Sequence, residues 1–578
     1  MKSGRKQART FIPETATVLG LLIAPVILPH IGFVPDTMNR ILVYGLFGIG
    51  FDLLFGYAGL LSFGQSAFFG TGGFVAAYLL TRMGLESVVL GLVVGTAVAA
   101  VTGFLVGLIA LRRTGIYFAM ITVAIAEVFF FMENSPLASF TGGENGLPGV
   151  PSPTIYLGFT TIRATSGWSM YGLLAVIYFA GIVIGRRIVG SPVGRIMVAI
   201  RENPLRAAAV GHDVRGYKLL AFVIAAAYAG LAGGLLGVLQ GYMPPEAFGF
   251  DTSGELVMQT VIGGLQTLVG PLVGAAVWLY LRDTLQSALG LGATWKLVLG
   301  VVFVLLVCFL RRGIIGGLRD LYFQLTGAGK KTAEPDLVAE DPAKSAARLA
   351  AAIAAAPLPS REIVKFSGPI LQTTNLSKRF GGLLANSDIN FAVGTGELRG
   401  IIGPNGAGKS TFFKMLTCEI PPSSGSILFE GRDITGLHVT RVCQLGLTKS
   451  YQVNQLFTRL TARENITISA LAERRGSFRL DFLRDAAHYP GIADLVQHTL
   501  QLVELAGRAD VPVSELAYGE KRRLEIGLAL ATSPSLLLLD EPLAGMSPRE
   551  RMETVKLLKS ISRGRTTIII DHDMDALF

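Results

Sequence analysis

Long apolar runs in the first 327 residues limit most strongly what this chain can fold into. Most of these runs approach the roughly 20 apolar residues that a helix needs to cross a hydrocarbon core about 30 Å thick. They lie at 16–28, 40–58, 61–81, 88–110, 115–133, 169–185, 218–238 and 295–310. The pattern predicts a multi-span α-helical membrane domain over residues 1–327.

The charge content agrees with a membrane protein. Only 16% of the residues are charged, whereas soluble domains carry about 25%. The net charge of +10 comes largely from short segments beside apolar runs, where Lys and Arg mark the cytoplasmic side. We therefore interpret the charge as topology and expect no nucleic-acid partner. The 70 glycines suit close packing of membrane helices.

The basic N-terminal segment, residues 2–9, is either part of a signal peptide or the cytoplasmic end of a retained first helix. We favour the retained helix because no small-residue cleavage site follows. The polar segment 133–169 is expected outside and the basic segment 186–218 inside. Residues 256–290 must then cross an even number of times, and they contain Gly263-Gly264 and Gly270-Pro271. They predict a broken or re-entrant hairpin in addition to eight full spans.

Residues 328–368 change to Lys, Glu, Asp, Pro and Ala and predict a linker, with a helical centre at 345–356. From 369 to 578, β-rich runs alternate with helical stretches, which is typical of an α/β domain with a largely parallel sheet. The runs 398–402 and 536–539 predict strands covered on both faces. The 3 cysteines are too few for a disulfide framework and too scattered for a zinc site.

A phosphate-binding loop follows the first of these strands. It matches G-x-x-x-x-G-K-S and is predicted to lie between a strand and a helix, so that backbone N–H groups cradle phosphates. Lys409 should reach the β- and γ-phosphates and Ser410 should bind Mg²⁺. The predicted set is Gly403, Pro404, Asn405, Gly406, Ala407, Gly408, Lys409, Ser410 and Thr411.

A pair of carboxylates ends the later strand. Asp540 at such a place holds the Mg²⁺ side of phosphoryl-transfer sites, and Glu541 can act as general base toward water. Without the phosphate loop, a buried strand ending in solvated acids would explain the pair equally well. Together the two motifs predict a P-loop NTPase.

A further motif lies between them: Leu516, Ala517, Tyr518, Gly519 and Glu520, followed by Lys-Arg-Arg-Leu-Glu. It resembles the signature motif of ATP-binding cassette (ABC) ATPases. The same family has counterparts for Phe380 (stacking on adenine), Gln452 (Q-loop), residues 544–547 (D-loop) and His572 (switch histidine).

The resemblance implies ATP and Mg²⁺ as cofactors. It implies Glu541, His572 and Gln452 as catalytic residues, and Ser410, Gln452 and Asp540 as Mg²⁺ ligands. It also implies that two cassettes pair head to tail, each ATP lying between one phosphate loop and the opposing 516–520 motif.

The cassette departs from the family pattern at Ala517 and at its end. Ala517 stands where serine is commonest, which removes a neutral hydrogen bond of about 0.5–1.5 kcal/mol. The chain stops at Phe578, where family cassettes continue. We therefore expect the cassette at 369–578 to be C-terminally incomplete.

The membrane half resembles the permease subunits of high-affinity branched-chain amino acid import systems. The resemblance rests on ordered segments such as Gly56-Tyr-Ala-Gly-Leu-Leu-Ser-Phe-Gly-Gln65 and Thr141-Gly-Gly-Glu-Asn-Gly146. It implies a fused permease and ATPase subunit in the bacterial inner membrane, in contact with lipid and with its cassette in the cytoplasm. Its implied partners are a second permease, a second ATPase and an extracytoplasmic substrate-binding protein. The alternative is a hydrolytically weak cassette-permease subunit for another solute such as urea, amides or aromatic acids.

The basic segment 190–218 is the predicted link between the halves. Ala207, Ala208 and Gly211 resemble the permease loop whose short helix fits a groove on the cassette, and we expect charged residues to pair at the rim of that groove. The alternative is a loop that marks orientation only. The predicted rim residues are Arg195, Arg201, Glu202 and Arg206.

Acidic residues inside spans are costly and usually face a cavity or a partner. Asp52 and Glu127 are such residues. Glu127 either meets a substrate ammonium group or makes a structural hydrogen bond. Gln65 and Ser66 are interpreted as packing residues rather than as part of the path.

Overall fold

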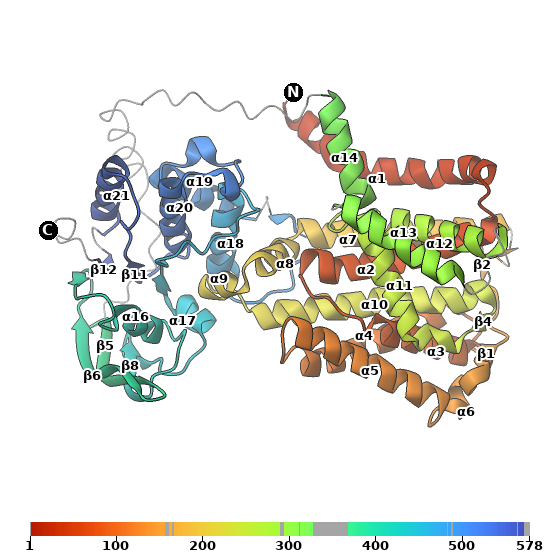
Figure 1. Cartoon of the computed structure of the whole chain (residues 1–578), viewed down its shortest axis with the longest axis horizontal. Helices are drawn as coiled ribbons and strands as arrows, with labels where there is room; N and C mark the ends of the chain where they lie inside the picture. The colour runs from red at the N-terminus through yellow and green to blue at the C-terminus, as the bar shows by residue number, and fades with distance from the viewer. Residues whose placement is uncertain are drawn as a thin grey trace. The chain divides into compact units, whose positions relative to one another are not determined.

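The computed structural model describes residues 2–156, 161–164, 167–288, 294–310, 312–326, 368–482, 484–486, 489–562 and 565–571. The chain forms two compact units, one of Met1–Gly190 with Lys218–Ala333 and one of Ser191–Tyr217 with Glu334–Phe578. The predicted linker at 328–368, with its helical centre, and His572 lie outside the described residues, apart from position 368. Figure 1 shows the whole chain.

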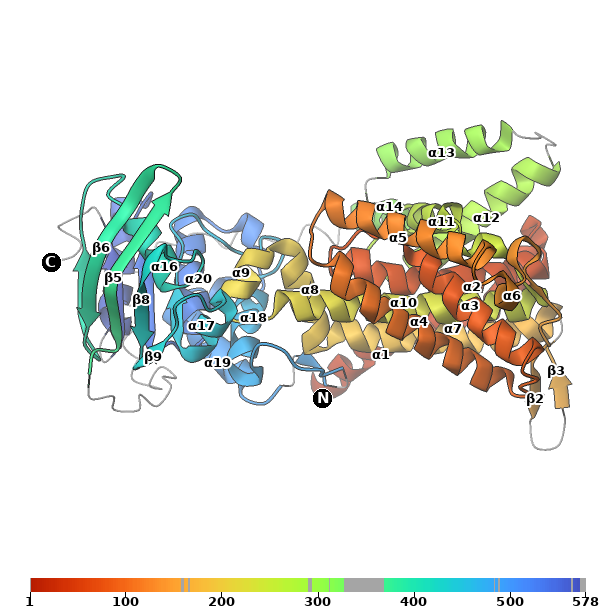
Figure 2. The ribbon, with the colours of Figure 1, turned by 90° about the horizontal axis from the view of Figure 1, so that it is seen from below.

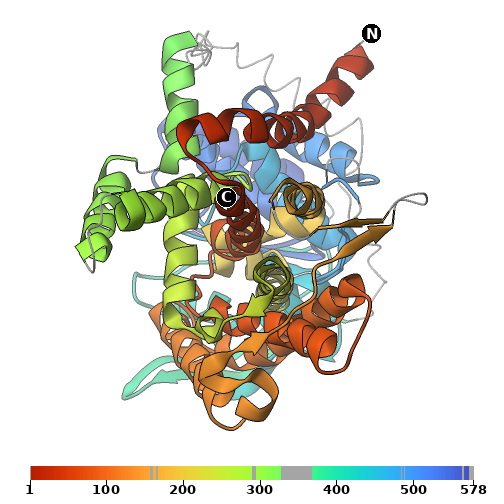
Figure 3. The ribbon, with the colours of Figure 1, turned by 90° about the vertical axis from the view of Figure 1, so that its right-hand side faces the viewer.

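The first unit is helical, as predicted. Its principal helices are α1 (Lys2–Ile27), α2 (Pro35–Phe51), α3 (Gln65–Thr81), α4 (Val88–Ala110), α5 (Ile116–Asn134), α7 (Gly167–Gly190), α10 (Val214–Gln240), α11 (Phe250–Gly263), α12 (Gly270–Asp283), α13 (Trp295–Phe309) and α14 (Gly313–Thr326). A short hairpin, β2 (Thr154–Tyr156) with β3 (Thr161–Arg163), projects from this bundle (Figures 2 and 3).

Within the described residues, 6 helices are long and apolar enough to cross a membrane, where the sequence predicted about eight. The difference lies at the first and third predicted spans. The apolar part of the first helix is short, Thr15–His30, and α3 has 17 residues. Helix α3 begins only at Gln65 because a π-helical turn (Asp52–Tyr57) and a loop precede it.

Glycines allow α10 to pack closely against its neighbours. A Cβ atom on Gly72 of α3 would lie 2.3 Å from the Cα of Gly230, and one on Gly103 of α4 would lie 2.4 Å from the Cβ of Ala226. Gln65 and Ser66 are buried at 1% and 0% exposure, as expected for packing residues. The prediction of helices in close contact through small residues is confirmed.

The broken hairpin is also confirmed. Helices α11 and α12 are 14 residues each and are separated by residues 264–269. Gln266 and Leu268 in this break have φ of 63° and 56°. Asp52 is fully buried and accepts hydrogen bonds from the amides of Gln266 (2.8 Å) and Leu268 (3.1 Å). Glu127, in contrast, is exposed on α5.

The second unit contains the α/β domain. A parallel sheet has the strand order β10-β11-β12-β7, and an antiparallel sheet has the order β6-β5-β8-β9 (Figure 2). The strands are β5 (Leu371–Phe380), β6 (Leu383–Val393), β7 (Leu398–Ile401), β8 (Ser424–Phe429), β9 (Arg432–Asp433), β10 (Leu447–Lys449), β11 (Leu536–Asp540) and β12 (Thr566–Ile570).

The described part of this unit also contains eight α-helices. They are α8 (Pro192–Glu202), α9 (Pro204–Ala209), α16 (Lys409–Leu416), α17 (Val439–Leu445), α18 (Ala462–Arg475), α19 (Ile492–Leu502), α20 (Tyr518–Leu530) and α21 (Pro548–Ile561).

Burial confirms the prediction for one of the two apolar strands and contradicts it for the other. All of β11 is buried between β10 and β12. In the described part of the sheet β7 is an edge strand, and Leu398 is 52% exposed. The expectation that both faces of 398–402 are covered is therefore wrong, because an apolar run does not show whether a strand is central or at an edge.

Candidate functional site

The phosphate loop connects β7 to α16, which begins at Lys409. Gly408 precedes this helix with φ of 86°, and a Cβ atom there would lie 2.4 Å from the carbonyl oxygen of Ala385. Only glycine fits both the backbone conformation and the space. The N-cap residue, Gly408, has no side chain to cap the helix, so the first N–H groups of α16 are available for an anion.

Lys409 lies across this loop. Its Nζ atom donates to the carbonyl oxygens of Gly403 (2.6 Å) and Pro404 (2.9 Å). Residues 404–407 are exposed, and Ser410 and Thr411 occupy the first turn of α16, half-buried. The loop thus presents an ammonium group, backbone donors and a hydroxyl on one accessible turn.

The two carboxylates follow at the end of β11. Asp540 is 2% exposed, and its Oδ2 lies 3.6 Å from the Nζ of Lys449. Burial raises the pKa of Asp540 above its ordinary value, Lys449 opposes this shift, and Glu541 adds to it. Glu541 has a φ of 46° and accepts a hydrogen bond of 2.7 Å from the Nε2 of Gln452. The structure therefore brings Gln452 and Glu541 together.

This donor set fits a nucleotide with Mg²⁺. Among the described residues the Oδ1 of Asp540 is buried without a hydrogen-bond partner, and such an atom usually has a ligand or water to satisfy it. A carboxylate and a serine hydroxyl are hard oxygen ligands, the type that Mg²⁺ prefers. Ser410 and Asp540 are the residues that would hold the ion.

The signature motif forms the start of α20. The carboxylate of Glu520 accepts from the backbone N–H of Ala517 at 2.9 Å. Tyr518 is 47% exposed, and its ring lies 3.0 Å from where a Cβ atom of Gly545 would be. The 516–520 motif and the 544–547 turn therefore touch within one cassette.

Phe380 lies at the end of β5 and is 47% exposed. The Nζ of Lys378 lies 5.1 Å from the centre of its ring. An exposed aromatic face at this place can stack on a base. The position of His572 falls outside the described residues.

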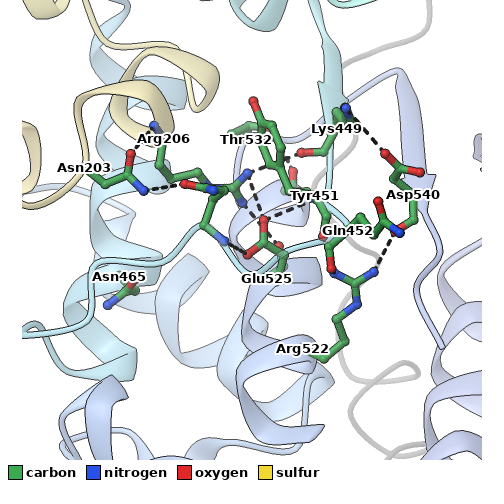
Figure 4. A network of polar contacts seen from close by, with 12 residues as sticks. Asn203, Arg206, Lys449, Tyr451, Gln452, Asn465, Arg522, Glu525, Thr532 and Asp540 are labelled. Atoms are coloured by element: carbon green, nitrogen blue, oxygen red, sulfur yellow. Dashed lines mark hydrogen bonds and ion pairs between the residues drawn. The ribbon is translucent and has the colours of Figure 1, made fainter. Parts of the chain in front are cut away.

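Sequence reasoning missed two residues that join the segment around Gln452, residues 450–455 and here called the Q-loop, to α20 (Figure 4). Arg522 is 1% exposed and donates to the carbonyl oxygens of Asp540 (2.6 Å), Gln452 (3.2 Å) and Pro542 (3.2 Å) as well as those of Tyr451 and Glu541. Glu525, one turn later, accepts from the backbone N–H of Tyr451 (3.4 Å) and Gln455 (2.9 Å). The available signal was the charged run that follows the signature motif.

The segment 191–217 contacts the cassette within the same compact unit. The Nε2 of Gln444 donates to the carbonyl oxygen of Gly211 at 3.0 Å, and the hydroxyl of Thr440 donates to that of Ala208 at 3.2 Å. The short helix in this segment is α9, and it packs against α17. The predicted contact between this loop and the cassette is confirmed.

The prediction that all four charged residues pair with the cassette at the rim of this contact is partly wrong. Arg195 pairs with Glu464 at 2.6 Å and Glu202 with Arg459 at 3.5 Å, and both pairs are partly exposed. Arg206 instead has a fully buried side chain, 3.2 Å from Glu525. A sequence does not show which of several neighbouring arginines meets a buried carboxylate, because the carboxylate belongs to a distant segment.

The comparisons with known proteins agree with these two parts. Residues 34–307 match the family described as branched-chain amino acid transport system / permease component, and residues 386–544 match the ABC transporter family. The ATP-binding protein BraF of Pseudomonas aeruginosa is 35% identical over 213 residues, which cover 36% of this chain and 84% of BraF.

The permease protein LivM of Escherichia coli is 27% identical over 316 residues, covering 51% of this chain and 73% of LivM. A crystal structure of a nucleotide-free cassette from an ABC transporter matches 36% of this chain and 83% of its own, with 28% identity and a TM-score of 0.31.

The ordered motifs, together with the two family matches and the sequence matches to BraF and LivM, establish a nucleotide-binding ATPase coupled to transport, joined to a membrane-embedded permease. The chain belongs to the branched-chain amino acid family of ABC transporters, with the permease and ATP-binding components in one polypeptide.

Proposed function

We propose that this protein imports branched-chain or related hydrophobic amino acids across the bacterial inner membrane, driven by ATP hydrolysis in a cytoplasmic cassette. The names of its relatives support the cargo. The observation that supports coupling of transport to ATP is the contact between the start of α9 and the Q-loop. The Nδ2 of Asn203, the N-cap residue of α9, donates to the Oε1 of Gln455 at 2.7 Å. The same loop presents Gln452 to Glu541.

The roles of the site residues follow from their chemistry. The loop of Gly403–Gly408 and Lys409 hold the phosphates, and Phe380 stacks on the adenine. Ser410, Asp540 and Gln452 would hold Mg²⁺, and the ion would supply positive charge to the phosphates there.

Glu541 accepts a proton from the attacking water, and Gln452 and His572 orient the reacting groups. The 516–520 motif contacts the ATP of an opposing cassette. The backbone N–H groups at the start of α20 supply this contact even though Ala517 has no hydroxyl.

The functional complex contains further subunits in this proposal. A second permease completes the pathway, a second ATPase completes the paired nucleotide sites, and an extracytoplasmic binding protein delivers the cargo. Lipid surrounds the exposed apolar faces of α4, α5 and α13, which carry residues such as Val89, Ile116 and Leu297.

The test uses the assembled complex in vesicles, with labelled leucine outside and ATP inside. Lys409→Ala and Glu541→Gln are each expected to lower uptake and ATP turnover by about a hundredfold or more. Uptake that is unchanged in Lys409→Ala contradicts the proposal. Unchanged uptake in both Glu541→Gln and His572→Ala favours the alternative, in which this cassette is hydrolytically weak and a partner hydrolyses ATP.

A further inference from the structure

The backbone of the Q-loop is held by one buried carboxylate. Glu525 accepts from the N–H of Tyr451 with Oε1 and from the N–H of Gln455 with Oε2, so its two oxygens hold the loop on both sides of Gln452 (Figure 4). The carbonyl oxygens of Tyr451 and Gln452 are held by Arg522. Residues of α20 thus fix both the donors and the acceptors of this loop.

Glu525 is fully buried, and a buried carboxylate needs compensation to stay ionised. The Nη1 of Arg206 lies 3.2 Å from its Oε1, with both side chains inaccessible to solvent. Burial raises the pKa of Glu525, while Arg206 and, second, Arg522 lower it. Arg206, from the segment 191–217, is therefore the largest single source of compensation for this carboxylate, ahead of Arg522 and the amides of Gln455 and Tyr451.

Arg206 also reaches the loop itself. It donates to the carbonyl oxygens of Lys449 and Glu525, each at 3.4 Å, and its guanidinium lies 5.4 Å from the centre of the Tyr451 ring. The Nζ of Lys449, at the end of β10, lies 3.6 Å from the Oδ2 of Asp540. Arg206 is therefore connected to the carboxylate end of β11 through the Q-loop, in addition to its pairing with Glu525 of α20.

We propose that Arg206 is a positioning residue for ATP hydrolysis: by pairing with Glu525 it keeps the Q-loop backbone in the place that presents Gln452 to Glu541. The inference rests on the proposed function and names the residue through which the 191–217 segment acts on the site. Arg206 touches no substrate and acts through Glu525.

The test compares variants in the complex purified from membranes with its partner subunits. Arg206→Met removes the charge and keeps the bulk. It is expected to lower kcat for ATP by about tenfold or more, with KM for ATP changed by less than about threefold, because the phosphate loop is untouched. Arg206→Lys keeps the charge without the planar fork and is expected to recover part of kcat. Arg195→Met is the matched control, since Arg195 pairs at the exposed margin of the same contact, and should leave kcat within about twofold.

A second measurement separates positioning from docking. Cysteines at Glu202 and Arg459, whose side chains lie 3.5 Å apart, report docking of the segment through a short thiol cross-linker. A loss of kcat in Arg206→Met with an unchanged cross-link yield supports the proposal. An unchanged kcat overturns it, and so does a kcat that falls only in proportion to the cross-link yield.

The nucleotide site itself supplies the last control. If Lys409→Ala abolishes turnover while Arg206→Met behaves as wild type, the proposed function stands and the role of Arg206 is refuted. If Lys409→Ala leaves turnover and uptake unchanged, the proposed function itself fails.

Discussion

The guanidinium of Arg522 is the most heavily used charged group at the site, because it donates to carbonyl oxygens of the Q-loop and of the segment after β11. Each buried acceptor left unsatisfied costs about 1–3 kcal/mol. Arg522→Met is expected to lower the unfolding free energy by at least about 2 kcal/mol and kcat by more than about tenfold. Thermal unfolding and ATP turnover of the full chain in its complex measure both.

Its neighbour Arg523 provides the control. It is 15% exposed and pairs with Glu504 and Glu553, each at 3.2 Å. Partly exposed pairs contribute about 0–1 kcal/mol, so Arg523→Met should have a clearly smaller effect. Equal effects of the two substitutions would contradict the role assigned to the buried hydrogen bonds of Arg522.

His212 makes the contact of the 191–217 segment sensitive to acid. Its side chain is fully buried, its Nε2 donates to the carbonyl oxygen of Ile468 at 2.8 Å, and it faces Arg475 and the ring of Tyr217. Burial lowers the pKa of His212 to about 4, and Arg475 adds to this shift although the Ile468 hydrogen bond opposes it.

The direction of the pH effect follows from this lowered pKa. When the segment is free, His212 takes up a proton as the pH falls through about 6.5. The docked form stays neutral, so docking is weakened from about pH 6.5 downward, by about 2 kcal/mol at pH 5. His212→Gln keeps a donor for Ile468 and should remove this dependence. Cross-link yield between positions 202 and 459, measured from pH 7.5 to 5, checks it; identical curves for both proteins would exclude His212 as the cause.

The motifs of the nucleotide site could be predicted from sequence because their spacing encodes a local backbone. Gly408 before Lys409 makes the turn into α16 almost independently of the remaining fold. Arg206 and Glu525 are 319 positions apart, and nothing near either residue shows that it is buried. Burial of a charge is decided by the distant partner that compensates it.

At the scale of elements, the hairpin of α11 and α12 shows what the local sequence can predict and what it cannot. Gly263-Gly264 and Gly270-Pro271 predicted the break, and the structure confirms it. Its supporting residue, Asp52, was predicted only to have some partner. The exposed face of β7 shows the opposite case, because the neighbours of a strand are set by topology and not by its own residues.

Asp52 is expected to stabilise the break. Non-glycine residues with positive φ cost about 1–3 kcal/mol each, and Asp52 bonds the amides of both such residues in the break, Gln266 and Leu268. Asp52→Ala should lower the unfolding free energy by about 3 kcal/mol or more, since it removes two hydrogen bonds to a charged group and each contributes about 1.5–3 kcal/mol. The unfolding free energy of Asp52→Asn, which keeps an acceptor, should lie between those of the wild type and of Asp52→Ala. Thermal unfolding in detergent ranks the stabilities of the three proteins, and equal stability of all three would contradict this role of Asp52.

For the whole molecule, the division into units does not follow the order of the chain. Residues Ser191–Tyr217 belong to the cassette unit, although residues on both sides of them belong to the membrane unit. The cassette is therefore attached to the permease chain twice, once covalently through 328–368 and once through the contacts of α8, α9 and His212. These contacts include a buried ion pair, hydrogen bonds from Thr440 and Gln444, and pairs at the margin.

The second attachment should persist when the first is cut. A protease site inserted between residues 328 and 368 allows the purified complex to be cleaved, and a tag on the permease part is expected to retain most of the cassette at pH 7.5. Arg206→Glu places a like charge against buried Glu525, which is strongly unfavourable without a partner, and should release the cassette after cleavage. Arg195→Glu at the exposed margin should release much less, since screened surface pairs contribute little. Complete release of the wild-type cassette on cleavage would show that the tether, and not the 191–217 segment, holds the two parts together.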